Sequence, residues 1–143
     1  MKSTSHPKRH CMVVFAFYPL GETRVQRQAE ALAENGYDVD VICLRGPDEA
    51  VFEDVRGINV YRLPVGRLLW FSGLVGRFLA YLLFLILTAF KLIPLHLKRR
   101  YGVVQVHNLP DFLVFCALFP KLMGAKTILD IHDVMPEFFG KEK

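Results

Sequence analysis

The sequence predicts an α/β protein with a Rossmann-like, doubly wound and mostly parallel sheet. Three observations predict it. Short apolar runs rich in β-forming residues recur along the chain, helix-periodic stretches separate several of them, and the 143 residues are 52% hydrophobic, which is enough for one packed domain. Strands that alternate with helices form βαβ units with right-handed crossovers and parallel pairing. We expect a basic polar tail over residues 1–10 and one domain over residues 11–143.

The first predicted unit is a strand, a turn and a helix. Residues Cys11–Phe17 are continuously apolar, as in a parallel strand buried on both faces. The turn "YPLGETR" follows, and residues 22–36 then have helical periodicity. Gly36 is placed to end this helix in a left-handed conformation. One stripe of the helix is apolar and should face the sheet: Val25, Ala29, Leu32 and Ala33.

Four more strands and a second helix are predicted in the rest of the chain. The strands are expected within residues 37–46, 57–65, 103–107 and 126–132. The helix is expected over residues 110–124, with Asn108 as its N-cap and Gly124 as its end.

Charge and cysteine content exclude several classes of protein. The formal charge of +4 and pI of about 9.1 suit an anionic ligand or a membrane surface and do not indicate nucleic-acid binding. Cys11, Cys43 and Cys116 each lie in an apolar run without metal-ligand spacing, so we expect reduced core thiols in a cytosolic protein, and no metal site. The glycine fingerprint of a dinucleotide site is missing, and we expect no cofactor.

The segment over residues 67–102 is unusually apolar and has three interpretations. It contains no charge from Phe78 to Phe90. It fits a core helix packed on the sheet, a helix lying in the membrane interface, or a transmembrane span. We favour the interfacial helix, because the uncharged stretch is shorter than the roughly 20 residues that a span needs. The basic cluster at its end also fits a solvated helix C-terminus. The predicted headgroup contacts are Arg67, Trp70, Arg77, Lys98, Arg99 and Arg100.

In a doubly wound sheet, ligands bind outside the carboxyl ends of the strands. The loop after Phe17 contains Gly21, which lets a ligand approach the backbone, and the next helix offers free N–H groups to phosphate. Arg24, in the first turn of that helix, could hold the phosphate with two hydrogen bonds. An ordinary turn with a solvent-facing arginine explains these residues equally well.

Polar residues also follow the fourth strand, where His107 would line the same crevice. Asn108 and Asp111 lie just beyond it, and helix capping alone can explain both.

A second polar cluster, in "DIHD", ends the last predicted strand. Alternation puts Asp130 and His132 on one face and Asp133 on the other. His132 could bind a sugar hydroxyl, a phosphate or a developing charge, with one of the carboxylates fixing its tautomer. The structural alternative is a hydrogen-bonded pair that stabilises the loop. We favour the ligand role because of the position at the strand end.

Two long stretches carry a resemblance to a known family. "FAFYPLGETRVQRQAEALAENGYDVDVICLRG" and "YGVVQVHNLPDFLVFCALFPKLMGAKTILDIHDVMPEFF" resemble the N-terminal domain of GT-B retaining glycosyltransferases of the glycosyltransferase-4 group. The likeness covers Met12 to Phe139. One departure is the first turn, which has the single glycine Gly21 where many relatives have a glycine pair.

The resemblance implies that this chain binds the acceptor, and that a second Rossmann-like domain, absent here, binds a nucleotide-sugar donor. It places His132, the predicted catalytic residue, beside the acceptor and the transferred sugar, and Glu137 near the cleft. We therefore expect sugar transfer to a lipid-linked or polysaccharide acceptor by a protein peripheral to the cytoplasmic membrane face. The chain alone, lacking the donor domain, should be inactive.

Two other functions remain open. The first is a non-catalytic, membrane-associated subunit of a split glycosyltransferase, whose donor domain lies on a separate polypeptide. The second is a different doubly wound module, such as a nucleotide-binding or flavodoxin-like regulator, which the missing phosphate-binding glycine motifs disfavour.

Overall fold

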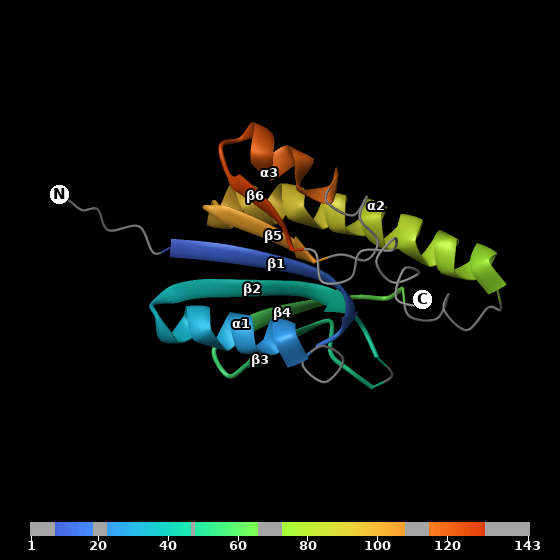
Figure 1. The fold of residues 1–143 in the computed structure, drawn as a ribbon, viewed down its shortest axis with the longest axis horizontal. Helices are drawn as coiled ribbons and strands as arrows, with labels where there is room; N and C mark the ends of the chain where they lie inside the picture. The colour runs from blue at the N-terminus through green and yellow to red at the C-terminus, as the bar shows by residue number, and fades with distance from the viewer. Residues whose placement is uncertain (1–7, 19–22, 47, 66–72, 108–114, 131–143) are drawn as a thin grey trace, which may run out of the picture.

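The computed structural model describes residues 8–18, 23–46, 48–65, 73–107 and 115–130. In these residues six strands form one sheet in the order β3-β4-β2-β1-β5-β6 (Figure 1). All neighbouring pairs are parallel except β3 with β4. This confirms the predicted mostly parallel α/β fold. The strands are β1 (Lys8–Phe17), β2 (Tyr37–Leu44), β3 (Phe52–Val55), β4 (Ile58–Leu63), β5 (Val103–His107) and β6 (Lys126–Asp130).

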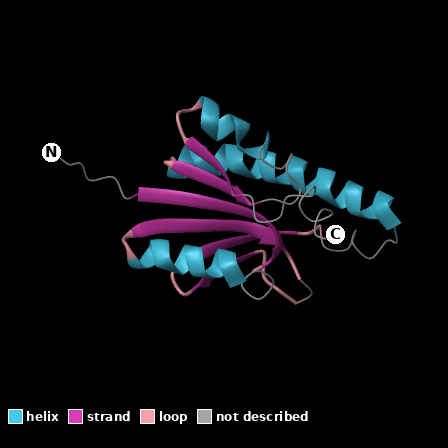
Figure 2. Ribbon diagram, in the orientation of Figure 1, coloured by secondary structure: helices cyan, strands magenta, loops and turns pink. Residues whose placement is uncertain are grey.

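Helices cover both faces of the sheet, as the doubly wound prediction requires (Figures 1 and 2). Helix α1 (Thr23–Glu34) packs on one face, where Val25 and Ala29 are buried against β1, β2 and β4. Helices α2 (Gly73–Arg99) and α3 (Leu118–Leu122) cover the other. Gly36 has a φ of 89°, which confirms its predicted place after α1.

The predicted strands are all present: β5 has the predicted bounds, and the end predicted for β6, residues 131–132, lies outside the described residues. The strand β1 begins at Lys8, so it includes three residues that were expected in the basic tail. In its described part the second predicted helix is present: residues 115–117 form a 3₁₀ turn, and the α-helix continues from Leu118. Its predicted start, over residues 110–114, lies outside the described residues. Pro120 explains why the regular α-helix begins at Leu118. A proline is tolerated in the first turn of a helix, where its missing N–H is not needed, but not in the interior.

The antiparallel strand β3 was not predicted. It pairs with β4 through a two-residue turn, Arg56–Gly57, in which both residues have positive φ, 54° and 84°. That is the geometry of a type I′ hairpin. Its sequence, "FEDV", has no apolar alternation, because β3 lies at the edge of the sheet and three of its four residues are exposed. The position of β3 is therefore decided by pairing and not by burial.

Both faces of helix α2 are apolar, but only one of them is buried. Every fourth residue faces the sheet and is buried: Gly76, Ala80, Phe84, Thr88 and Leu92. The opposite side carries large apolar residues in the open, namely Val75, Leu79, Ile86, Phe90 and Leu97, which we call the outer stripe of α2. The inner face confirms the core-helix interpretation, while the outer stripe leaves the interfacial one open.

Candidate functional site

The carboxyl ends of β1, β5 and β6 lie together at one end of the parallel strands. We call this end of the sheet the ligand edge, and the end with the amino ends of the strands the amino edge. In the parallel register, Val13 of β1 is opposite Val106, and His107 is opposite Asp130. Neighbouring strands are about 4.8 Å apart, so the backbones of His107 and Asp130 are adjacent. The strand arrows of β1, β5 and β6 point to this edge in Figure 2. The register therefore puts the backbones of two predicted site residues side by side.

His107 lies on the α1 side of the sheet. Val104 and Val106 pack in the core under α2, so the alternate residues Gln105 and His107 face the other way. Gln105 confirms this direction, because its amide donates to Gln28 of α1 at 2.9 Å. His107 is buried, with only 1% of its surface exposed.

Arg24 occupies the first turn of α1 and is exposed. That turn contains no acidic residue, so no carboxylate within it compensates the partial positive charge at the start of the helix. The first N–H groups of the helix have no partner within it, which suits an anion. Arg24 and the start of α1 thus form the basic side of the ligand edge.

Arg62 of β4 is a residue of this edge that sequence reasoning missed. Its side chain is 2% exposed, and its Nη2 donates to the Tyr18 carbonyl, 3.1 Å away, immediately before the loop that leads to α1. Its Nη1 donates to Glu53 at 2.7 Å, and its Nε lies 3.5 Å from Glu49. One guanidinium therefore connects the end of β1 with β3 and the loop after β2. The only sequence signal is an arginine at an inward-facing strand position.

The remaining predicted ligand-edge residues lie outside the described residues: Gly21, Asn108, Asp111, His132, Asp133 and Glu137. Arg67 and Trp70, two of the predicted headgroup contacts, also lie outside them.

The other predicted headgroup contacts have different surroundings. Arg77 is exposed on α2, where its Nη1 donates to the Tyr81 hydroxyl at 3.4 Å. Lys98 and Arg100 are exposed at the C-terminal end of α2. Arg99 instead turns inward and forms ion pairs with Asp38 at 2.7 Å and Asp40 at 2.6 Å. Its charge is neutralised by these two carboxylates, so Arg99 is not a lipid contact.

The Arg99 pairs belong to a polar network at the amino edge of the sheet, opposite the ligand edge. Asp40 is fully buried and accepts hydrogen bonds from the Tyr101 hydroxyl at 2.5 Å and Asn59 at 2.9 Å. Burial raises the pKa of Asp40, against the opposing effects of these two bonds and of Arg99. The network fastens the end of α2 to β2 and β4, which is a structural role.

Nothing in the described residues indicates a metal or a reactive thiol. Within them, no three His, Cys, Asp or Glu side chains gather into a possible metal site. The three cysteines are free and buried, and burial raises the pKa of both Cys43 and Cys116 to about 12. They are therefore protonated at neutral pH and unreactive.

Helix α2 is, in the part of the chain that the structure describes, the one helix long and apolar enough to cross a membrane by length and composition. Its middle and C-terminal half are packed on the sheet through Phe84, Thr88 and Leu92, and Arg99 pairs with Asp40 at its end. A span would have to remove these contacts.

The chain matches a known protein family. A family model described as a glycosyl transferase 4-like domain matches residues 21–141, which include α1 and every strand after β1. No curated protein matches the chain.

Proposed function

We propose that this chain, which belongs to the glycosyl transferase 4-like family, is the acceptor-binding N-terminal part of a retaining GT-B enzyme. The family's chemistry is glycosyl transfer, so a sugar donor and an acceptor are its substrates. The observation that supports the acceptor role is the ligand edge, where His107 and Asp130 lie in register beside β1 and Arg24 opens α1. A nucleotide-sugar donor would be held by a further domain or by a separate polypeptide.

Each ligand-edge residue has a role in this proposal. Arg24 and the start of α1 bind a phosphate of the substrate, and Gly21 lets that phosphate approach the backbone. His132 touches the transferred sugar, with Asp130 or Asp133 fixing its tautomer. His107, Asn108, Asp111 and Glu137 bind sugar hydroxyls. No metal takes part.

Transfer of labelled sugar from a panel of nucleotide-sugars to a cell lipid and polysaccharide extract tests this role, using the protein isolated from its own cells. A hydrogen bond to a charged group contributes about 1.5–3 kcal/mol, so Arg24→Gln should lower kcat/KM roughly tenfold or more. Arg56→Asn, at the opposite edge of the sheet, is the matched control. Equal activity of both variants would remove Arg24 from the site.

The same assay distinguishes the split-subunit alternative. If activity appears only when a second polypeptide from the same cells is added, the donor domain is a separate subunit. If no nucleotide-sugar supports transfer under either condition, the acceptor proposal is wrong.

We also propose that the protein is peripheral to the cytoplasmic face of the membrane and binds it through the outer stripe of α2. From Val75 to Leu97 this stripe measures about 33 Å along the helix and carries no charge. Exposed apolar surface of this extent marks an interaction site. Lys98 and Arg100 beside its end favour anionic headgroups over an apolar protein partner. Because the inner face stays on the sheet, the helix would lie in the interface and not cross it.

Co-sedimentation with lipid vesicles tests the membrane proposal. The double substitution Leu79→Glu with Ile86→Glu places two charges on the outer stripe and should abolish vesicle binding. Val51→Glu alters an equally exposed apolar residue away from α2 and should leave binding unchanged. If the protein ignores vesicles but forms dimers that the double substitution disrupts, a second copy of the chain covers the stripe instead.

A further inference from the structure

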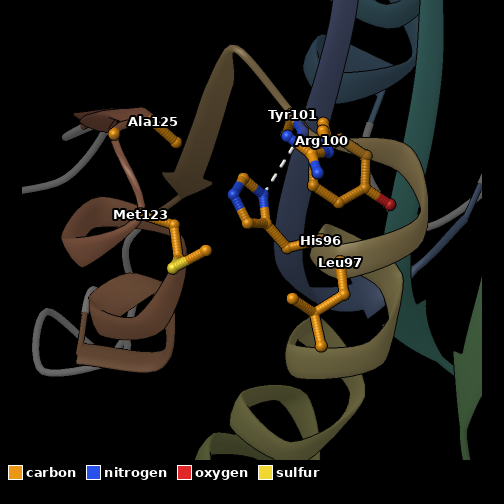
Figure 3. A pocket seen from close by; sticks show the side chains of 7 residues that line it. His96, Leu97, Arg100, Tyr101, Met123 and Ala125 are labelled. Carbon is orange, nitrogen blue, oxygen red and sulfur yellow. Dashed lines mark hydrogen bonds between the residues drawn. The ribbon is translucent and has the colours of Figure 1, made fainter.

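A small cavity lies at the amino edge of the sheet, between the C-terminal end of α2 and the turn from α3 to β6 (Figure 3). Its volume is about 170 Å³, below the roughly 300–1,000 Å³ of pockets for drug-sized ligands. It is far from the ligand edge, at the other end of the parallel strands. Its lining includes His96, Leu97, Arg100, Tyr101 and Met123.

His96 offers this cavity a fixed hydrogen-bond donor. Its Nδ1 accepts the backbone N–H of Tyr101 at 3.2 Å, so the neutral ring carries its proton on Nε2. Figure 3 shows that other nitrogen on the side of Met123 and Ala125. Burial, and then the charge of Arg100, lower the pKa of His96 and keep the ring neutral near pH 7. The donor direction is therefore set before any ligand binds.

The surroundings of the cavity are cationic. Arg100 lines it, and the exposed residues Lys98, Lys121 and Lys126 lie on the adjoining segments. No carboxylate is among the residues that line the cavity. Arg99, the remaining cation of this helix end, is neutralised by Asp38 and Asp40 and does not add to it. The charge balance favours an anion with several acceptor oxygens.

Apolar side chains reach the same place. Leu97 ends the outer stripe of α2, and Met123 follows the exposed Leu118 and Leu122 of α3. The helices α2 and α3 cover the same face of the sheet (Figure 1), so a bilayer bound to the outer stripe of α2 would lie on the side of the molecule that carries the exposed apolar residues of α3. A ligand here would meet a polar donor pair inside and apolar surface outside. Phospholipids have that chemistry.

We propose that this cavity binds the phosphate of an anionic phospholipid headgroup, with the His96 Nε2–H and the Arg100 guanidinium as its donors. The proposal rests on the membrane location proposed above. It adds a lipid preference and an orientation, because it fixes the C-terminal end of α2, at the amino edge of the sheet, to the bilayer surface. Inorganic phosphate has the same recognition chemistry, so the two sources must be distinguished.

Binding of the whole chain to phosphatidylcholine vesicles, with and without phosphatidylglycerol, is the measurement. Wild type should prefer the anionic vesicles. Arg100→Asn removes the charge while keeping a residue that tolerates the φ of 54° found here, and should lower the preference about fivefold or more. Arg27→Gln, an equal loss of charge on α1, should leave it unchanged.

A cavity-filling substitution distinguishes binding in the cavity from attraction by the surface charge in general. Met123→Trp adds bulk at the cavity without changing charge, and an interfacial tryptophan by itself favours membrane binding. If the cavity is the site, Met123→Trp weakens the anionic preference as Arg100→Asn does. If Met123→Trp has no effect and Lys98→Gln equals Arg100→Asn, the attraction is diffuse and the proposal is overturned.

A second experiment adds inorganic phosphate without vesicles, to distinguish free phosphate from a lipid headgroup. The His96 imidazole resonances are followed by NMR in wild type and in Arg100→Asn. If wild type binds no vesicles but phosphate shifts His96, the membrane proposal fails and the site takes free phosphate, which overturns the lipid source. If neither vesicles nor phosphate bind, the site itself is excluded. Vesicle binding without any anionic preference keeps the membrane proposal and excludes this one.

Discussion

Arg62 shows how one buried side chain can organise the ligand edge. It connects the end of β1, the loop after β2 and β3, and its charge is balanced by Glu49 and Glu53. A guanidinium can do this because its five donors are fixed in a planar fork. Its Nη2 holds the Tyr18 carbonyl, so the departure of the chain toward α1 depends on it.

Replacing Arg62 with methionine should lower the free energy of unfolding by about 1–3 kcal/mol, because the buried Tyr18 carbonyl loses its donor. Both glutamates are partly exposed and can be hydrated instead. Arg62→Lys should rescue little, since one ammonium cannot reach all three segments. Urea denaturation measures the change. The exposed Arg27→Met should stay within about 0.5 kcal/mol, and equal losses in both would contradict this role.

His96 should make the stability depend on pH. Its pKa in the folded state is lowered, so the unfolded chain binds the proton more tightly, and stability falls as pH drops below the unfolded value of about 6.5. Protonation also removes the acceptor for the Tyr101 N–H. His96→Asn retains an acceptor near Nδ1 without titrating, so its stability should fall less between pH 7 and 5. Identical pH profiles of unfolding would exclude His96 as a source.

At the scale of elements, α2 is the part whose two faces differ most in environment. Its inner face is buried against the sheet and its outer stripe is exposed, yet both are apolar. The loss of stability caused by a substitution in α2 should therefore depend on the burial of the residue and not on its type.

Two phenylalanines of α2 form a matched pair for this. Phe84 is 0% exposed and Phe90 is 67% exposed. Phe84→Ala should destabilise the protein by about 3–5 kcal/mol, whereas Phe90→Ala should change stability by less than about 1 kcal/mol in the absence of lipid. Thermal unfolding of both variants measures this. A comparable loss for Phe90→Ala would mean that the outer stripe is covered in solution.

At the scale of the whole molecule, the two edges of the sheet have different tasks in the proposals. The ligand edge gathers Arg24, His107 and Asp130 for substrate. The amino edge holds the Asp40 network and the cavity beside His96. Helix α2 runs between the edges, so binding its outer stripe to a membrane would place the ligand edge near a lipid-linked acceptor. In the proposals, this arrangement would bring the carboxyl ends of the strands to a substrate that stays in the bilayer.

The sequence by itself determined the class of fold, the strands of the parallel sheet, the helix α1 with its end at Gly36, and the end of the sheet where the carboxyl ends of the parallel strands lie together. These follow from local periodicity and from the rule that parallel strands end together. The tertiary structure alone decided the rest: the pairing of β3, the burial of Arg62, the inward turn of Arg99 and the cavity beside His96. Each depends on contacts between residues distant in the chain. The residue type of an arginine does not show whether its side chain faces water or a buried aspartate. For α2 the sequence was apolar on every side, so only packing on the sheet could decide which face is outside.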